Sequence, residues 1–162
     1  MFRGIRAMKT EFFLIIAVSL TPLAAAAQPI GWHDYVVPES GAVAQMPTDI
    51  FSEDGGKPDS GYGRRFFTSS RRANLTVQSI PNDANDTPAV FLAKKHPPSD
   101  IAYRRVTSRS FVVSSYRENK IWYNRCNFAA HFVNCVLIDY PAAEKRQWDS
   151  VVTRISNTLA SR

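Results

Sequence analysis

The chain is poor in the residues from which metal centres and reactive thiols are built. Its 162 residues include only two cysteines and three histidines. The histidines are His33, His96 and His131, and no two of them have the spacing that places two ligands on one face of a helix or strand. We therefore expect neither a metal site nor a bound cofactor.

The familiar sequence motifs of catalysis are also missing. The chain has no G-x-S-x-G elbow, no S-x-x-K, no H-E-x-x-H and no Walker loop. Because catalytic partners need not be close in sequence, Ser69, Ser70, Ser114 and Ser115 keep an envelope hydrolase with a dispersed active site as the alternative. We expect a binding or accessory domain rather than an enzyme.

The chain also lacks a run of apolar residues long enough to span a membrane. A helix needs about 20 apolar residues to cross a bilayer, whereas the apolar run at residues 12–20 is short and is followed by Thr21 and Pro22. Basic residues precede this run and small residues follow it, namely Arg3, Arg6 and Lys9 before it and Ala25, Ala26 and Ala27 after it. This order is typical of a secretory signal peptide.

We therefore predict that residues 1–27 are a signal peptide, cleaved near Ala27, and that residues 28–162 form one globular α+β domain. Met8 is an alternative start, because a compact signal also begins there. No cysteine lies near the cleavage site, which argues against a lipid anchor. The mature protein is expected in the periplasm or outside the cell, without a transmembrane anchor.

The excess of positive charge is small. The chain has 20 Lys and Arg against 14 Asp and Glu, and the signal peptide removes three basic residues and Glu11. The remaining 17 basic and 13 acidic residues leave about +4, without the basic clusters of nucleic-acid-binding proteins. We expect a cell-envelope protein or an anionic surface as the partner, and no nucleic acid.

Arginine doublets are the best lead to a binding site. Adjacent residues of a strand point to opposite faces, so a doublet within a strand, such as Arg104 and Arg105, does not make a continuous patch. The pair at 71–72 lies at a predicted turn, next to the strand that carries the pair at 64–65. The candidate contacts for an anionic partner are therefore Arg64, Arg65, Arg71 and Arg72. Ordinary solubilising charge is the alternative.

Both cysteines, Cys126 and Cys135, lie in the mature part of the chain. An even number of cysteines in an exported chain favours a disulfide, and two buried free thiols are the alternative. If the two face each other in antiparallel strands, paired positions sum to 261, which sets Asn124 opposite Leu137. Such a pair brings the Cα atoms close enough for a structural disulfide.

This register also assigns side chains to the two faces of the predicted sheet. One face carries Trp122, Cys126, Phe128, Val133, Cys135 and Leu137, and the other carries Ile121, Tyr123, Val136, Ile138 and Tyr140. Both faces are apolar, so both need cover from other elements. Aromatic residues on strands and helices are usually buried, so we expect Trp32, Trp122, Trp148, Tyr123 and Tyr140 in the core; a ligand groove is the alternative.

Periodicity and turn residues predict the remaining elements. Strands are expected at the start of the mature chain as a hairpin, at 64–70, 73–80, 101–107, 110–116, 120–128 and 132–140, with an exposed loop at 52–63. A helix of about ten residues begins at Pro88, capped by Asp86 or Thr87. A C-terminal amphipathic helix carries the apolar stripe Trp148, Val151, Val152, Ile155 and Leu159, with Ser156 off that stripe.

These elements predict an α+β fold, with a central antiparallel sheet of about six to eight strands and helices packed on it. An open two-layer α+β sheet is the alternative.

The order of these elements, with the strings FVVSSYRENKIWYNRCNF, VLIDYP and WDSVVTRISNTL, resembles small exported alphaproteobacterial proteins of unassigned function. Their fold is similar to the PsbP and Mog1-like domain, and the similarity covers residues 32–159. PsbP relatives include extrinsic proteins of the photosynthetic oxygen-evolving complex, and Mog1 binds a small GTPase. The resemblance thus implies an α/β/α sandwich and a docking function, and it assigns a role to no residue.

Overall fold

The computed structural model describes residues 31–95, 97 and 100–161. The predicted signal peptide lies outside the described residues. In chain order the elements are β1 (Trp32–Val36), β2 (Val43–Pro47), β3 (Glu53–Asp54), β4 (Tyr62–Phe67), β5 (Asn74–Pro81), α1 (Pro88–Lys94), β6 (Tyr103–Val106), β7 (Ser110–Arg117), β8 (Lys120–Phe128), β9 (Phe132–Pro141), the short 3-10 helix η1 (Ala142–Glu144) and α2 (Lys145–Thr158).

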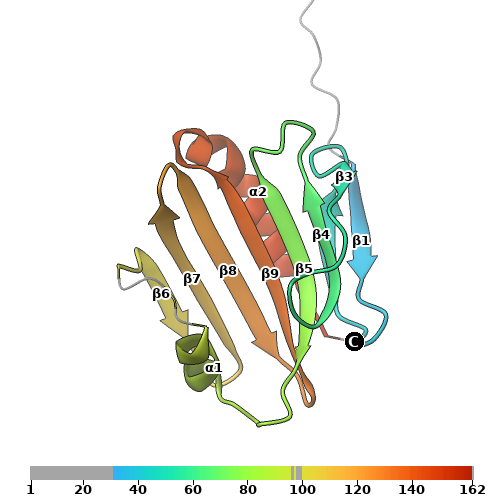
Figure 1. Ribbon diagram of the computed structural model, residues 1–162, viewed down its shortest axis with the longest axis vertical. Coiled ribbons are helices and arrows are strands. Elements are labelled where there is room, and N and C mark those ends of the chain that lie inside the picture. The colour runs from blue at the N-terminus through green and yellow to red at the C-terminus, as the bar shows by residue number, and fades with distance from the viewer. Residues whose placement is uncertain (1–30, 96, 98–99, 162) are drawn as a thin grey trace, which may run out of the picture.

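Seven of the described strands form one antiparallel sheet in the order β3-β4-β5-β9-β8-β7-β6, and β1 and β2 form a separate hairpin (Figure 1). The central strand β9 pairs with β8, its neighbour in sequence, and with β5, which precedes it by about 50 residues. This long-range pair joins the two halves of the chain. The α+β architecture and the strand count are those predicted.

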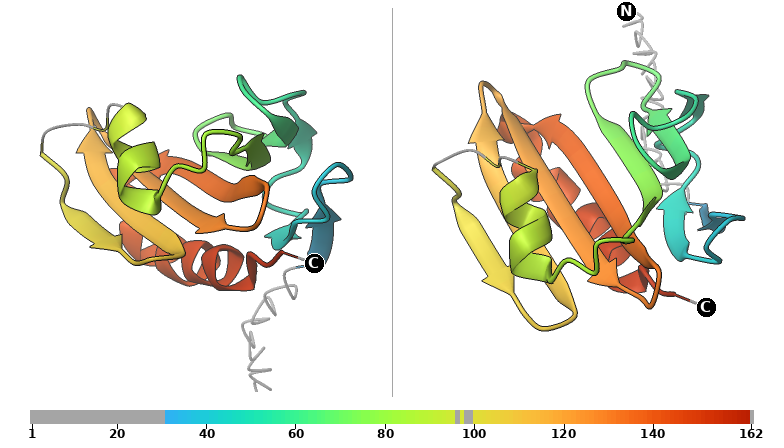
Figure 2. Two further views of the ribbon diagram at one scale, coloured as in Figure 1. Left: turned by 90° about the horizontal axis from the view of Figure 1, so that it is seen from below. Right: turned by 60° about the horizontal axis from the view of Figure 1, so that its bottom comes forward.

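The register of β8 and β9 is also the one predicted. Cys126 pairs with Cys135, and Asn124 pairs with Leu137. The side chains assigned to the two faces belong to two separate hydrophobic clusters, one containing Val136, Ile138 and Tyr140 and the other containing Cys126, Val133 and Cys135. The helices lie on opposite faces of the sheet (Figure 2).

One face is covered by α2 and the β1–β2 hairpin. The predicted apolar stripe of α2 is buried, with Ile155 at 0% exposure. Ser156 was expected off this stripe but is buried at 2%, because its hydroxyl forms a hydrogen bond with that of Tyr123 on β8. Among the described residues, no helix has the length and apolar character to span a bilayer.

The other face is covered only in part, by α1. Thr87 caps this helix, accepting a hydrogen bond at Oγ1 from the backbone N–H of Val90 over 3.4 Å, and Pro88 occupies the first turn. The helix has seven residues rather than about ten, and it buries Phe91 and Leu92. Such a short helix covers one end of the sheet and leaves the middle open.

The segment at 52–63 is largely exposed, as expected, but it is not a loop throughout. It contains β3, and β4 begins within it at Tyr62. The chain folds back on β4 because the Gly55 N–H donates to the Arg65 carbonyl over 2.7 Å and the Arg65 N–H donates to the Gly56 carbonyl over 2.9 Å. These backbone hydrogen bonds have no signal in a sequence of Gly, Pro, Asp and Ser.

The predicted disulfide is present between Cys126 and Cys135, whose Cα atoms are 4.1 Å apart. It joins β8 to β9 next to the loop that connects them. Because the bond closes a loop of about ten residues, the chain-entropy model gives it about 2.5 kcal/mol of stability.

Replacing both cysteines with alanine should therefore lower the free energy of unfolding by about 2.5 kcal/mol, measured by urea denaturation of a chain of residues 28–162. Reduction of the unaltered protein should give a similar loss, which serves as the control. A loss below about 1 kcal/mol, or free alkylated thiols in protein from its native compartment, would contradict a structural disulfide.

A candidate binding trough

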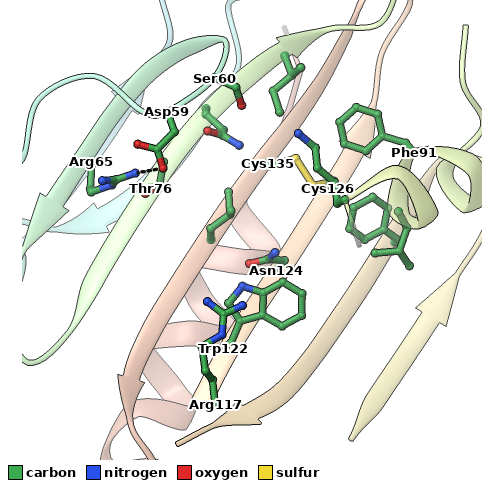
Figure 3. Close-up of a pocket in the computed structure, with 16 residues that line it drawn as sticks. Asp59, Ser60, Arg65, Thr76, Phe91, Arg117, Trp122, Asn124, Cys126 and Cys135 are labelled. Carbon is green, nitrogen blue, oxygen red and sulfur yellow. Dashed lines mark hydrogen bonds and ion pairs between the residues drawn. A yellow bond between two sulfur atoms is a disulfide. The ribbon is translucent and has the colours of Figure 1, made fainter. Parts of the chain in front are cut away.

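The open part of the α1 face contains a trough. Its main hollow has a volume of about 280 Å³ and is lined from β4, β5, β7, β8, β9, α1 with the residue that follows it, and the loop before β4. A second hollow of about 350 Å³ adjoins it and shares six lining residues: Asp59, Arg65, Thr76, Arg117, Trp122 and Leu137. Figure 3 shows Arg65 and Asp59 on one side, Phe91 on the other, and the disulfide and Asn124 between them.

Strand register brings the floor of the trough together. Asn124 on β8 pairs with Leu137 on β9, which pairs with Thr76 on β5, which pairs with Arg65 on β4. Gln78 lies two residues along β5 from Thr76 and opposite Cys135. Directly paired residues of neighbouring strands point to the same face, so these side chains form one surface across four strands.

Three polar side chains on this floor lack protein partners. Thr76 and Gln78 are only 5% and 8% exposed, and neither side chain makes a hydrogen bond with a described residue. Asn124 is half-buried, but its Oδ1 is fully buried and has no hydrogen-bond partner in the described structure. Buried polar groups are normally paired. The polar atoms of Thr76 and Gln78 are therefore open to solvent in the trough and available to a ligand, whereas the Asn124 Oδ1 is the buried side-chain oxygen left without a partner among the described residues.

A buried asparagine on the other face of the sheet shows the contrast. Asn134 of β9 is 1% exposed and fully engaged: its Oδ1 accepts from the Ser79 hydroxyl over 2.7 Å, and its Nδ2 donates to the Ser161 Oγ over 2.7 Å. The same residue type thus has its partners where the sheet is covered and lacks them in the trough.

Apolar and cationic groups surround the polar floor. The disulfide, Leu137, Leu92 and other apolar side chains form the walls. The Arg117 guanidinium lies 5.7 Å from the centre of the Trp122 ring, and the Lys95 ammonium lies 5.1 Å from that of Phe91. Neither cation makes an ion pair with a described residue. The trough therefore carries positive charge that the protein does not neutralise.

The four arginines predicted from the doublets are all engaged in ion pairs. Each pairs with its own carboxylate: Arg64 with Asp54 at 2.8 Å, Arg65 with Asp59 at 2.9 Å, Arg71 with Glu53 at 3.0 Å, and Arg72 with Glu144. Only Arg65 lines the trough. A contact of these four residues with an anionic partner stays a prediction.

The ion pair between Arg64 and Asp54, at the edge of the sheet, lies where the pKa of the aspartate is shifted. The Gly56 N–H, with a smaller contribution from the Arg64 guanidinium, lowers the pKa of Asp54 below its ordinary value. This carboxylate lies among the residues of a separate, shallow hollow beside β1, away from the trough. Its hydrogen bonds are internal, so it holds the β3–β4 edge together.

Sequence reasoning placed Asn124 opposite Leu137 but did not identify the floor as a site. The missing information was the pairing of β5 with β9, which adds Thr76 and Gln78 to the same surface. Of the aromatic residues expected in the core, Tyr140 and Trp148 are buried there, whereas Trp122 is only partly buried and lines the trough. Neither described histidine, His33 or His131, lines it.

Comparison with known proteins confirms the fold. In sequence, no family model and no curated protein matches the chain. In structure, it is similar to cyanobacterial PsbP (CyanoP) from Synechocystis sp. PCC 6803, with a TM-score of 0.60 and 9% identity over 88% of this chain and 100% of that chain. The chain has a PsbP-like fold. The similarity to small alphaproteobacterial proteins stays a prediction, and at this identity the shared fold assigns no function to a residue.

The unpaired floor gives a test by stability. Asn124→Leu removes a buried oxygen that has no partner, so it should raise the free energy of unfolding of the ligand-free protein by about 1 kcal/mol. Asn134→Leu, the matched control, breaks two hydrogen bonds and should lower it by about 2 kcal/mol. Urea denaturation measures both. Equal destabilisation by the two substitutions would show that Asn124 has partners of its own in the protein.

Proposed function

We propose that the chain is an exported binding domain that docks a cell-envelope partner in the trough on the α1 face. The observation that carries this proposal is the floor of Thr76, Gln78 and Asn124, three polar side chains that make no hydrogen bond with a described residue. A protein gains no stability from such groups. A ligand that supplies the missing hydrogen bonds accounts for them.

Export is supported by the amino-terminal segment and by the disulfide. Residues 1–27 have the basic, apolar and small-residue regions of a signal peptide. Cys126 and Cys135 are bonded, which fits an oxidising compartment such as the periplasm or the extracellular space. The PsbP-like fold fits an accessory or binding role.

Binding is better supported than hydrolysis. The two carboxylates of the trough are engaged by nitrogen donors, Asp59 by Arg65 and Asp139 by Asn74, and neither contacts a hydroxyl group through a described hydrogen bond. The serines named for a dispersed site lie elsewhere: Ser115, for example, donates to the Asp100 carbonyl. A nucleophile paired with a base is not among the described residues that line the trough.

Filling the trough tests the docking site in the native host. A photocrosslinking amino acid at Ser60, on the rim, should form an adduct with an envelope component, and Thr76→Trp in the same chain should reduce that adduct at least tenfold. Ser114→Trp, which fills a hollow on the α2 face, should leave it unchanged. Docking in the trough would be contradicted if Thr76→Trp left the adduct unaffected. It would also be contradicted if the photocrosslinking amino acid at position Arg146 on α2 formed the same adduct as efficiently as the one at Ser60.

Export has its own measurement. Amino-terminal sequencing of the protein from the envelope fraction of the native host should find Gln28 as the first residue. A chain that begins at Met1 or Met8 and stays in the cytoplasm would contradict export, whatever the trough binds.

A further inference from the structure

We infer that the occupant of the trough is an extended polypeptide segment that carries an acidic side chain. The inference rests on the proposed function, since it names the chemistry of the partner at the same site. Backbone amides of the segment meet the amide side chains of Gln78 and Asn124, and its carboxylate meets Arg117 or Lys95.

The polar floor argues against an acyl chain. Lipid methylenes would seal Thr76, Gln78 and Asn124 away from water without giving them hydrogen bonds, and each unpaired buried group is costly. A polypeptide backbone brings a donor and an acceptor at every residue. Two amide side chains, each with a donor and an acceptor, match that supply.

The aromatic rings argue against a saccharide. Sugar rings need a free aromatic face on which to stack, but the guanidinium of Arg117 lies over Trp122 and the ammonium of Lys95 lies over Phe91. The rings instead hold the two cations at the trough. Both cations keep N–H groups to donate, which suits a carboxylate.

The balance of charge selects an acidic segment. The two hollows are lined by three cationic side chains, Arg65, Lys95 and Arg117, and by two carboxylates, Asp59 and Asp139. Asp59 forms an ion pair with Arg65, and Asp139 accepts a hydrogen bond only from the neutral Asn74 amide, whereas Lys95 and Arg117 have no anionic partner among the described residues, so two unpaired cations face one unpaired carboxylate. The unpaired charge available to a ligand is therefore positive.

The width of the trough floor suits a short extended segment of a bound polypeptide. The floor crosses β4, β5, β9 and β8, three inter-strand spacings or about 14 Å, which is the length of about four extended residues. The disulfide fixes β8 to β9 beneath this stretch, so the floor is ordered before binding. A pre-ordered site loses less conformational entropy on binding than a flexible one.

Selection from a displayed library of random seven-residue peptides tests the inference, with the disulfide-bonded protein as bait. Sequences recovered by the unaltered protein should be enriched in Asp and Glu over the input library, and Thr76→Trp should not recover them. A recovered peptide is then synthesised and titrated by NMR. It should shift the side-chain amide signals of Asn124 and Gln78 and the indole signal of Trp122.

Charge is tested on the same peptide. Replacing Arg117 and Lys95 together with Gln should weaken its binding at least tenfold, as loss of a charge-assisted hydrogen bond does, whereas Arg146→Gln on the exposed surface of α2 should leave it unchanged. Three results would overturn the acidic part of the inference. The first is equal weakening by both variants, and the second is equal binding of a peptide with Asn and Gln in place of Asp and Glu. The third is the recovery of peptides without acidic enrichment.

Decanoate serves as the comparison probe and separates two kinds of failure. If decanoate, and no peptide, shifts the signals of Asn124 and Trp122, the polypeptide inference is wrong while the trough remains a binding site. If peptides shift only signals of the hollow beside Tyr103 and Tyr116 on the α2 face, or no probe shifts the trough signals, both the inference and the proposed site are wrong.

Discussion

The pairing of β8 with β9 is the contact on which the rest of the structure depends. It joins nine pairs of residues, contains the disulfide and supplies the central strand on which β5 adds the first half of the chain. Because side chains alternate between faces, a shift of one residue would turn every apolar side chain of a strand to the wrong face. The disulfide between directly opposite residues excludes that shift.

The same pairing explains why the sheet has one sealed face and one open face. On the sealed face, the apolar residues of β8 and β9 meet the stripe of α2 and the hairpin β1–β2, and the polar Asn134 is engaged by Ser79 and Ser161. On the open face, α1 is the only helix among the described residues, and it is seven residues long. Thr76 and Gln78 of β5 and Asn124 of β8 make no hydrogen bond there with a described residue, and the trough lies over them.

Local patterns were enough to predict most of the fold. The β8–β9 register and the apolar stripe of α2 depend on neighbouring residues, which the sequence displays directly. The short strand β3 and the burial of Ser156 were missed because each depends on hydrogen bonds to a distant element.

The trough was missed for the same reason. Its floor joins Asn124 to Thr76 and Gln78 through β9, and no sequence pattern announces that β5 pairs with β9. The sequence pointed instead to Arg64, Arg65, Arg71 and Arg72, but each of these forms an ion pair with a carboxylate. The unpaired cations, Lys95 and Arg117, are single residues that only the folded chain places beside aromatic rings in the trough.

The central claim is that the unpaired polar floor is a binding surface for a polypeptide. Intermolecular nuclear Overhauser effects, measured on the disulfide-bonded protein with a bound peptide, test it most directly. The account predicts contacts from the side-chain amide protons of Asn124 and Gln78 to the backbone of the peptide. Contacts confined to α2 or to the β1–β2 hairpin, with the amide protons of both residues unaffected, would contradict it.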